Sequence, residues 1–395
     1  IELSNTQIYL YRTDSIWRHQ FLLDYFSSGT STKKSKTPSR FKLHLKEAIA
    51  QNFGFHQTDE WNGQRIKGQL DKLELNANQL NLSDDKIDIK KLALTNPSIR
   101  LVSFSPKRKM AEEKAANAES PWQLDGKKIS INSFQIINGF IKIDQNSLTR
   151  KSGFDPSHME IANLQAFLSN SLMSGDTLQS DLEIAATEKS GFQLKKLKGV
   201  FLLSPKQLSI KKFLLETPYS RLQESIQLSF SKLSDLTQFS KKVTITSDFN
   251  NSIIGTQDLS FFIPAAAHWK SAVRVGGLVQ GKLNDLAIRQ LSIGIGSGTY
   301  VQGNLTIRGL PNVEQTSFEL SVARSNINWE ELHNLLSSQT KTDLSVGEAL
   351  RYVRFNGKLL GSKSQLKLTG NWQTRLGAAE TALQLELPQI GRAHV

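Results

Sequence analysis

One spacing of apolar residues recurs along the chain and limits what the chain can fold into. In each copy, two apolar residues two positions apart are followed, after four intervening residues, by a second such pair. Residues two apart lie on the same face of a β-strand, so each pair predicts a strand with one apolar face. The clear copies are Ile1, Leu3, Ile8 and Leu10; Leu73, Leu75, Leu80 and Leu82; Leu92, Leu94, Ile99 and Leu101; and Phe134, Ile136, Ile141 and Ile143.

The step between the two pairs is odd, which would put them on opposite faces of one straight strand. A two-residue turn at Asn138-Gly139 would return Ile136 and Ile141 to one face, because the two residues would then lie opposite each other. Pro97, and Pro218 in a degenerate fifth copy, cannot take the positive φ of a type I′ turn and need another turn or a bend. The copies therefore predict hairpins with one apolar side.

A pair of polar residues precedes the hairpin in four copies, and the apolar parity changes immediately after it. A β-bulge has this effect, since it inserts one residue, bends the strand and increases its twist. Repeated bulges would curl the sheet. The polar pairs are Asp71-Lys72, Lys90-Lys91, Asn132-Ser133 and Lys211-Lys212.

The second half of the chain has a different repeat but the same β character. The sequence VQGKL at 279–283 returns as FNGKL at 355–359, and residues 301–308 alternate between apolar and polar. Helix signals are few: one at 233–239, and one at Trp329 that Asn328 is predicted to cap. We predict a mainly β fold, an elongated, curled antiparallel sheet of repeated hairpins that forms a β-groove, with few short helices.

The repeats and the composition of the segments between them suggest a division of the chain. Residues 390–395 (IGRAHV) match the translation of a sequencing adapter, and we expect them not to belong to the protein. The predicted segments are β-hairpin repeats at 1–104, a charged loop at 105–122, further β-hairpin repeats at 123–230, a short helix and connection at 231–270, and a second β-repeat region at 271–389.

Few residues suggest chemistry. The chain has no cysteine, which excludes disulfides and thiol catalysis, and its seven histidines form no H-x-H or H-x-x-x-H pair. The glycines at 294–298 precede a strand and lack the lysine of a phosphate-binding loop, so we expect a turn. The net charge is +13, but the lysines are dispersed without an aromatic ladder. We expect no enzymatic activity, metal, cofactor or nucleic-acid partner.

Several stretches carry a resemblance to a known family. Residues 86–101 (KIDIKKLALTNPSIRL), preceded by DEWNG at 59–63 and by residues 73–82, resemble the repeats of AsmA-like and TamB-like envelope proteins, in particular the divergent forms from Bacteroidota. Residues 277–310 and the turn at 327–336 resemble them as well. The resemblance implies a long periplasmic protein, anchored in the inner membrane by an N-terminal helix. It also implies an apolar β-groove that carries phospholipid, and assembly of outer-membrane proteins with a barrel partner. The chain would then be an internal fragment, with the anchor helix outside it.

The residue pattern leads to a compatible interpretation by itself. A bent sheet with one apolar face must cover that face, and the sequence predicts too few amphipathic helices to do so. Acyl chains could cover it, at about 0.8 kcal/mol per buried CH₂. The closed core of a β-sandwich remains an alternative for each position, and an extracellular or surface β-repeat scaffold without lipid is the alternative function. The predicted groove residues are Leu73, Leu75, Leu92, Leu94, Ile99, Leu101, Phe134, Ile136, Ile141 and Ile143.

Overall fold

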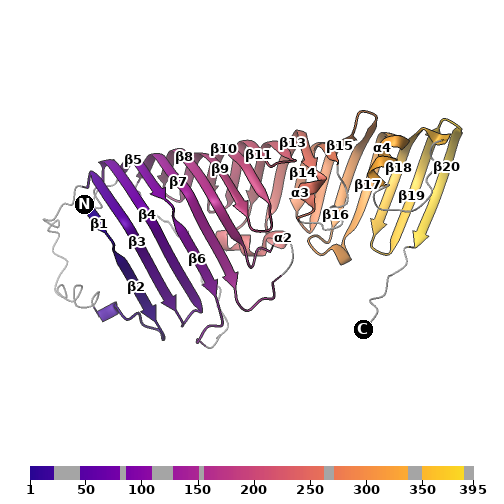
Figure 1. Ribbon diagram of the computed structural model, residues 1–395. Helices are drawn as coiled ribbons and strands as arrows, with labels where there is room; N and C mark the ends of the chain where they lie inside the picture. Colours follow the sequence, from indigo (N-terminus) through magenta and orange to yellow (C-terminus); the bar gives the residue numbers. More distant parts are fainter. Residues whose placement is uncertain are drawn as a thin grey trace. The chain divides into compact units, whose positions relative to one another are not determined.

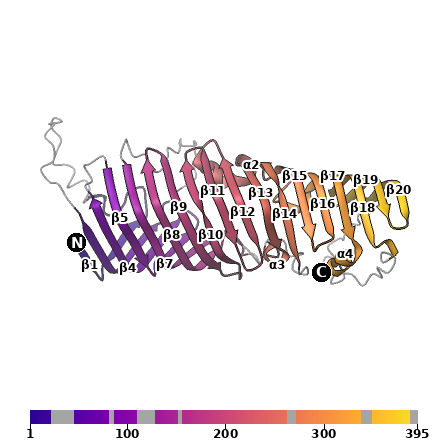
Figure 2. The ribbon, with the colours of Figure 1, turned by 90° about the horizontal axis from the view of Figure 1, so that it is seen from above.

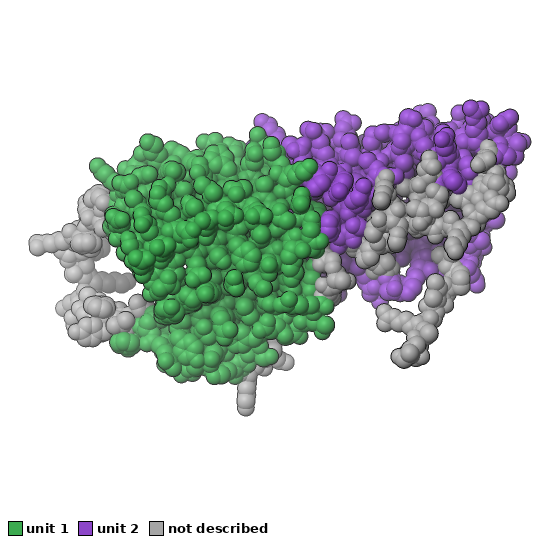
Figure 3. Space-filling view, in the orientation of Figure 1, with its two compact units in different colours: residues 1–198 green, residues 199–395 purple. Residues whose placement is uncertain are grey.

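The computed structural model describes residues 1–21, 45–80, 86–108, 128–150, 155–261, 271–336 and 349–386. The strands belong to one largely antiparallel sheet of twenty strands, which confirms the predicted mainly β fold with few short helices. The chain divides into two compact units, Ile1–Lys198 and Gly199–Val395 (Figure 3), called unit 1 and unit 2 below. Among the helices in the described ranges, none has the length and apolar character needed to cross a membrane.

Unit 1 is built from strands (Figure 1). Its hairpins β3–β4, β7–β8 and β8–β9 are antiparallel. The strands are β1 (Glu2–Ser4), β2 (Gln7–Arg12), β3 (Glu47–Asp59), β4 (Gln64–Gln79), β5 (Lys86–Thr95), β6 (Ser98–Ser103), β7 (Lys128–Gln145), β8 (Glu160–Ser174) and β9 (Thr177–Glu188); β10 (Gln193–Ser204) contains the unit boundary.

Several predicted hairpins are instead bends, because the chain continues in the same direction on both sides of the expected turn. β7 runs without interruption through Asn138-Gly139, so the turn predicted there is wrong. β5 and β6, on either side of Asn96-Pro97, both pair in parallel with β7, and β1 and β2 both pair in parallel with β3. The turn predicted at Thr217-Pro218, in contrast, joins β11 (Gln207–Glu216) to β12 (Arg221–Ser229) as an antiparallel hairpin.

Five asparagines with positive φ mark the level at which several strands of unit 1 bend. Asparagine tolerates this left-handed conformation better than other residues with a Cβ atom, because its short polar side chain forms local hydrogen bonds. The Asn52 amide donates to Asn5 Oδ1 (3.0 Å), and the Asn138 amide donates to Asn96 Oδ1 (2.8 Å). We call this set the asparagine row: Asn5 (φ 52°), Asn52 (51°), Asn96 (49°), Asn138 (55°) and Asn163 (53°).

The predicted bulges are present at two of the four positions. The β4–β5 register shifts opposite Lys90, and the β11–β12 register shifts at Lys212, where φ is 51°. At Asp71-Lys72 the β3–β4 register is unchanged, and at Asn132-Ser133 the β7–β8 register is unchanged. The bulge predictions at these last two places are wrong, because neither strand of each pair has an extra residue relative to its partner there.

Unit 2 is a meander in which each strand from β11 to β20 pairs antiparallel with the next (Figures 1 and 2). Its remaining strands are β13 (Thr244–Gly255), β14 (Ala272–Lys282), β15 (Asp285–Ile295), β16 (Thr299–Arg308), β17 (Ser317–Asn328), β18 (Tyr352–Ser362), β19 (Gln365–Thr374) and β20 (Gly377–Glu386).

Short helices occupy connections between the strands of unit 2. The structure confirms the two predicted helices, at 233–239 and from Trp329, and Asn328 Oδ1 accepts from the Glu331 backbone N–H (3.3 Å) as a cap. The helices are η2 (Leu233–Gln238), α2 (Phe239–Lys242), α3 (Thr256–Leu259), η4 (Val313–Gln315) and α4 (Trp329–Leu336).

Candidate functional site

The strand register of unit 1 aligns apolar side chains in rows that cross the strands. Direct cross-strand partners point to the same face of a sheet, so each row lies on one face. The first row contains Leu3, Ala50, Leu73, Leu94, Ile136, Ala166 and Ile184, and the second contains Ala48, Leu75, Leu92, Phe134, Leu168 and Leu182.

Two further rows lie on the other side of the asparagine row. They bring in the remaining predicted groove residues, Ile99, Leu101, Ile141 and Ile143. The third row contains Ile8, Phe55, Gly68, Ile99, Ile141 and Ile161, and the fourth contains Leu10, Gln57, Ile66, Leu101 and Ile143.

Gly139 shows that the rows on both sides of the bend share one face. A Cβ atom on Gly139 would lie 2.8 Å from Ile136 Cγ2 and 3.2 Å from Leu164 Cβ, so all three positions point to the same side. Ile141 is two residues beyond Gly139 in β7 and points to that side as well. The ten predicted groove residues therefore lie on one face of unit 1, although a bend in the strand and not a hairpin brings them there.

This apolar face is only partly buried. Nine of the ten predicted groove residues are half-buried, and the tenth, Ile99, is 42% exposed. In the described part of unit 1 the regular elements are strands, and helical backbone is confined to Gln20 and Phe21, so no helical layer covers the rows. Three row members, Ala50, Ala166 and Leu182, are buried, but among all described hydrophobic side chains only Val243 is completely inaccessible to solvent. A closed sandwich core would bury many more.

Unit 2 carries two apolar rows that the sequence analysis did not single out. The signal was the alternation at 301–308, which was used only to predict a strand. At the edge strand β20, the row residues Leu383 and Leu385 are 50% and 52% exposed. One row contains Leu208, Leu228, Ile245, Gly281, Leu286, Ile307, Phe318, Gly361, Leu366 and Leu385, and the other contains Ile210, Ile226, Ser247, Val279, Ile288, Leu305, Leu320, Leu359, Leu368 and Leu383.

The opposite face of the sheet in unit 1 is charged. Lys91 Nζ lies 3.2 Å from Glu74 Oε2, and Lys142 Nζ lies 3.0 Å from Glu160 Oε2. Hydrogen bonds from Lys72, followed by those from Lys91, lower the pKa of Glu74. Such exposed pairs add little stability. They do identify the face that meets water, and the sheet of unit 1 is therefore amphipathic.

Asp59 fixes the turn between β3 and β4, within the DEWNG stretch. Arg12 Nε donates to Asp59 Oδ1 (2.9 Å), Arg12 Nη2 donates to Oδ2, and the Asn62 backbone N–H donates to Oδ1 (3.0 Å). Burial disfavours the charged carboxylate, but these hydrogen bonds outweigh burial and hold the pKa of Asp59 below its ordinary value. This buried ion pair joins the end of β2 to the β3–β4 hairpin and has a structural role.

The glycine-rich segment forms the expected turn between β15 and β16. The Glu331 carboxylate, from the first turn of α4, accepts from the backbone N–H groups of Ser297 (2.8 Å) and Gly298 (2.9 Å). A side-chain hydrogen bond from Thr299, together with these backbone donors, lowers the pKa of Glu331 despite burial. A protein carboxylate thus occupies the donors that a phosphate-binding loop would offer. Within the described ranges, no cluster of three or more His, Asp or Glu could hold a metal.

Comparisons of the chain with protein-family models, with curated proteins and with solved structures find no match.

Proposed function

We propose that the apolar face binds phospholipid acyl chains, and that the chain is part of a non-enzymatic, periplasmic bridge protein of outer-membrane biogenesis. The observation that carries the proposal is the continuity of the partly buried apolar rows from strand to strand. In the part of unit 1 that the structure describes, no helical layer covers the apolar rows, and such an amphipathic sheet needs another apolar covering, because exposed apolar surface costs free energy in water. Acyl chains can supply that covering, because they have no polar groups that need hydrogen-bond partners on the sheet.

The length of the rows suits an acyl chain. The first row of unit 1 crosses seven strands, β1, β3, β4, β5, β7, β8 and β9. At a strand spacing of about 4.8 Å the row is roughly 29 Å long. One leaflet of a bilayer core is about 15 Å thick, so an extended acyl chain fits along the row. Each CH₂ that leaves water contributes about 0.8 kcal/mol.

The resemblance to AsmA-like and TamB-like proteins supports the cellular context of the proposal. It adds an inner-membrane anchor in a helix outside this chain, transport of phospholipid toward the outer membrane, and an outer-membrane barrel protein of the assembly machinery as partner. These features rest on the degenerate apolar spacing and on the quoted stretches, and they form part of the proposal.

Photo-crosslinking tests lipid binding with matched neighbours. Leu359 lies on the apolar face and Leu360 on the opposite face of the same strand, where it is 39% exposed. Ile136 and Ile137 form the same kind of pair in unit 1, with Ile137 44% exposed. A photo-crosslinking amino acid at each position, in the full chain directed to a bacterial periplasm, is expected to capture phospholipid at Leu359 and Ile136 only.

Two outcomes would contradict the proposal. Equal lipid capture at both members of each pair would indicate nonspecific adsorption. Absence of lipid at all four positions, together with no co-purifying phospholipid, would favour the alternative of a β-repeat scaffold without lipid cargo.

A further inference from the structure

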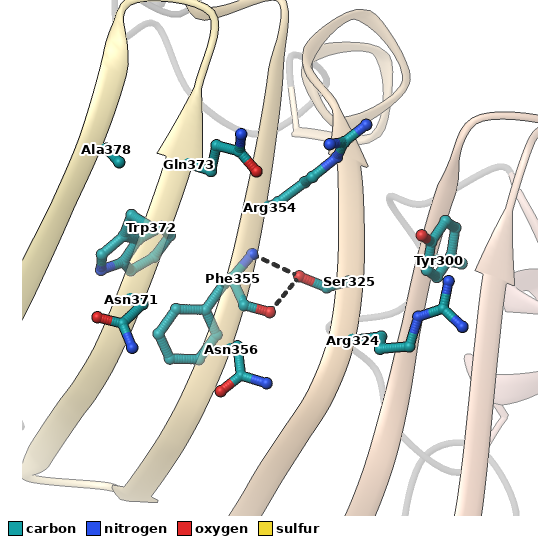
Figure 4. A pocket seen from close by; sticks show the side chains of 10 residues that line it. All are labelled: Tyr300, Arg324, Ser325, Arg354, Phe355, Asn356, Asn371, Trp372, Gln373 and Ala378. Carbon is teal, nitrogen blue, oxygen red and sulfur yellow. Dashed lines mark hydrogen bonds between the residues drawn. The ribbon is translucent and has the colours of Figure 1, made fainter.

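Unit 2 contains an open cavity whose polar side chains point away from the apolar rows. Its volume is about 580 Å³, and it lies over strands β16 to β20. Its lining residues are Tyr300, Arg324, Ser325, Arg354, Phe355, Asn356, Asn371, Trp372, Gln373 and Ala378 (Figure 4). By register, Arg324, Arg354 and Gln373 alternate with the apolar-face residues Ser325, Phe355 and Trp372. The charged and amide side chains of the cavity therefore lie on the face opposite the apolar rows, whereas Ser325, Phe355 and Trp372, which also line it, belong to the apolar face.

A bulge accounts for the cavity. The β17–β18 ladder is interrupted between Val322 and Ile327, where residues 323–326 oppose only residues 354–356. Ser325 bridges the gap, because its Oγ donates to the Phe355 carbonyl and accepts from the Phe355 N–H, both at 2.8 Å. Bulges re-aim side chains and are common beside binding sites. Here the bulge places Arg324 and Arg354 at the same opening.

The cavity is cationic. It has two arginines and no acidic residue in its lining, and within the described ranges neither arginine forms an ion pair with a carboxylate. Arg354 Nε donates to Asn326 Oδ1 (3.3 Å), and its guanidinium lies 5.0 Å from the centre of the Tyr352 ring. These neutral partners hold Arg354 in place without neutralising its charge.

The other lining groups supply further hydrogen bonds. Arg324 extends toward Tyr300, and Asn371 and Gln373 add side-chain amides from β19 (Figure 4). Glu380 lies opposite Asn371 on β20 and does not line the cavity. Guanidinium groups bind phosphate oxygens with two parallel N–H donors, and amides complete such sites.

We propose that this cavity binds a phosphate group, with Arg324 and Arg354 as the charged donors. The group belongs either to a soluble phosphate ester or to the headgroup of an anionic phospholipid. The site does not depend on lipid binding to the opposite face, so the crosslinking test at Leu359 and the test below can succeed or fail separately.

The test measures binding by the full chain to two probes, soluble glycerol phosphate and vesicles of phosphatidylglycerol, with phosphatidylcholine vesicles as the uncharged reference. The variant carries Arg324→Gln and Arg354→Gln. The control carries Arg308→Gln and Lys363→Gln, which removes the same charge from residues that pair with Asp285 and Glu314 outside the cavity. A charged hydrogen bond contributes enough that each arginine is expected to change affinity by roughly tenfold or more.

The outcomes separate the sources and the explanations. Wild-type binding to glycerol phosphate that the cavity variant alone loses supports a soluble ester as the source. Loss confined to phosphatidylglycerol vesicles supports a headgroup. Equal weakening in variant and control would overturn the proposal, since net charge would then explain the attraction, and so would absence of binding to both probes at moderate salt.

Discussion

Asn138 is the position at which the bent-strand description can be tested most directly. It lies inside β7 with a φ of 55°, and its side-chain amide donates to Asn96 Oδ1 (2.8 Å). We compare Asn138→Ala with Asn138→Gly. Both substitutions remove the hydrogen bond to Asn96, so the difference between them reports the backbone conformation at residue 138.

The two conformations predict opposite orders of stability. In a regular strand, glycine is less stable than alanine by roughly 0.5–1 kcal/mol, because it loses more conformational freedom on folding. In the left-handed region, alanine carries a steric cost of about 1–2 kcal/mol that glycine does not. At Asn138 we therefore expect Asn138→Gly to be more stable than Asn138→Ala by about 1 kcal/mol. At Gln135, an ordinary position of β7, the glycine variant should be the less stable one.

Urea denaturation followed by far-UV circular dichroism measures both pairs, with the transition midpoints compared at equal slope. The expected result is a reversal of the glycine–alanine order between positions 138 and 135. The same order at both positions would refute the reasoning, because Asn138 would then be an ordinary strand residue. Ile136 and Ile141 would in that case lie on opposite faces, and the single apolar face of unit 1 would be lost.

Three further predictions concern other local features. Gly303→Ala should destabilise the protein by about 1–3 kcal/mol in urea denaturation, because its Cβ would collide with the β17 backbone, whereas Gly68→Ala, with no atom closer than 3.9 Å, should be neutral or stabilising. Asp59→Asn should be less stable than the wild type, and the difference should have its full size above pH 3.8, the ordinary pKa of the carboxyl group. It should shrink as the pH falls through the lower pKa of Asp59 in the folded protein, and thermal melts across pH 2–6 would measure this. Glu331→Gln should speed hydrogen exchange of the Ser297 and Gly298 amides, because both donate hydrogen bonds to the Glu331 carboxylate.

The apolar spacing predicted which residues share a face but not how the chain brings them together. Asn138-Gly139 suits a type I′ turn and a left-handed bend equally, because both need positive φ at asparagine. Distant residues decide between the turn and the bend, since β5 and β6 together pair with the whole length of β7 and keep it extended. Such long-range pairing is not encoded in a local pattern. For the same reason, the apolar rows of unit 2 follow only from the pairing of its strands and not from the sequence.

The cavity at Arg324 and Arg354 also depends on long-range pairing and could not be predicted from local sequence. The two arginines are thirty positions apart, and neither belongs to a sequence motif. They meet because one extra residue in β17 interrupts the ladder with β18. The isolated sequences around the two arginines contain no glycine-rich or charged signal for that bulge.

The asparagine row explains why several strands of unit 1 bend together. A left-handed residue reverses the parity of its own strand, so a bend in a single strand would turn half of that strand's apolar side chains to the charged face. The apolar rows stay continuous only if neighbouring strands reverse at the same level. Asn52 contacts Asn5, and Asn138 contacts Asn96, so the side chains at the bend also link one strand to the next. The apolar face is therefore continuous only because neighbouring strands bend together. A change that straightens one strand should disrupt the apolar rows on its neighbours.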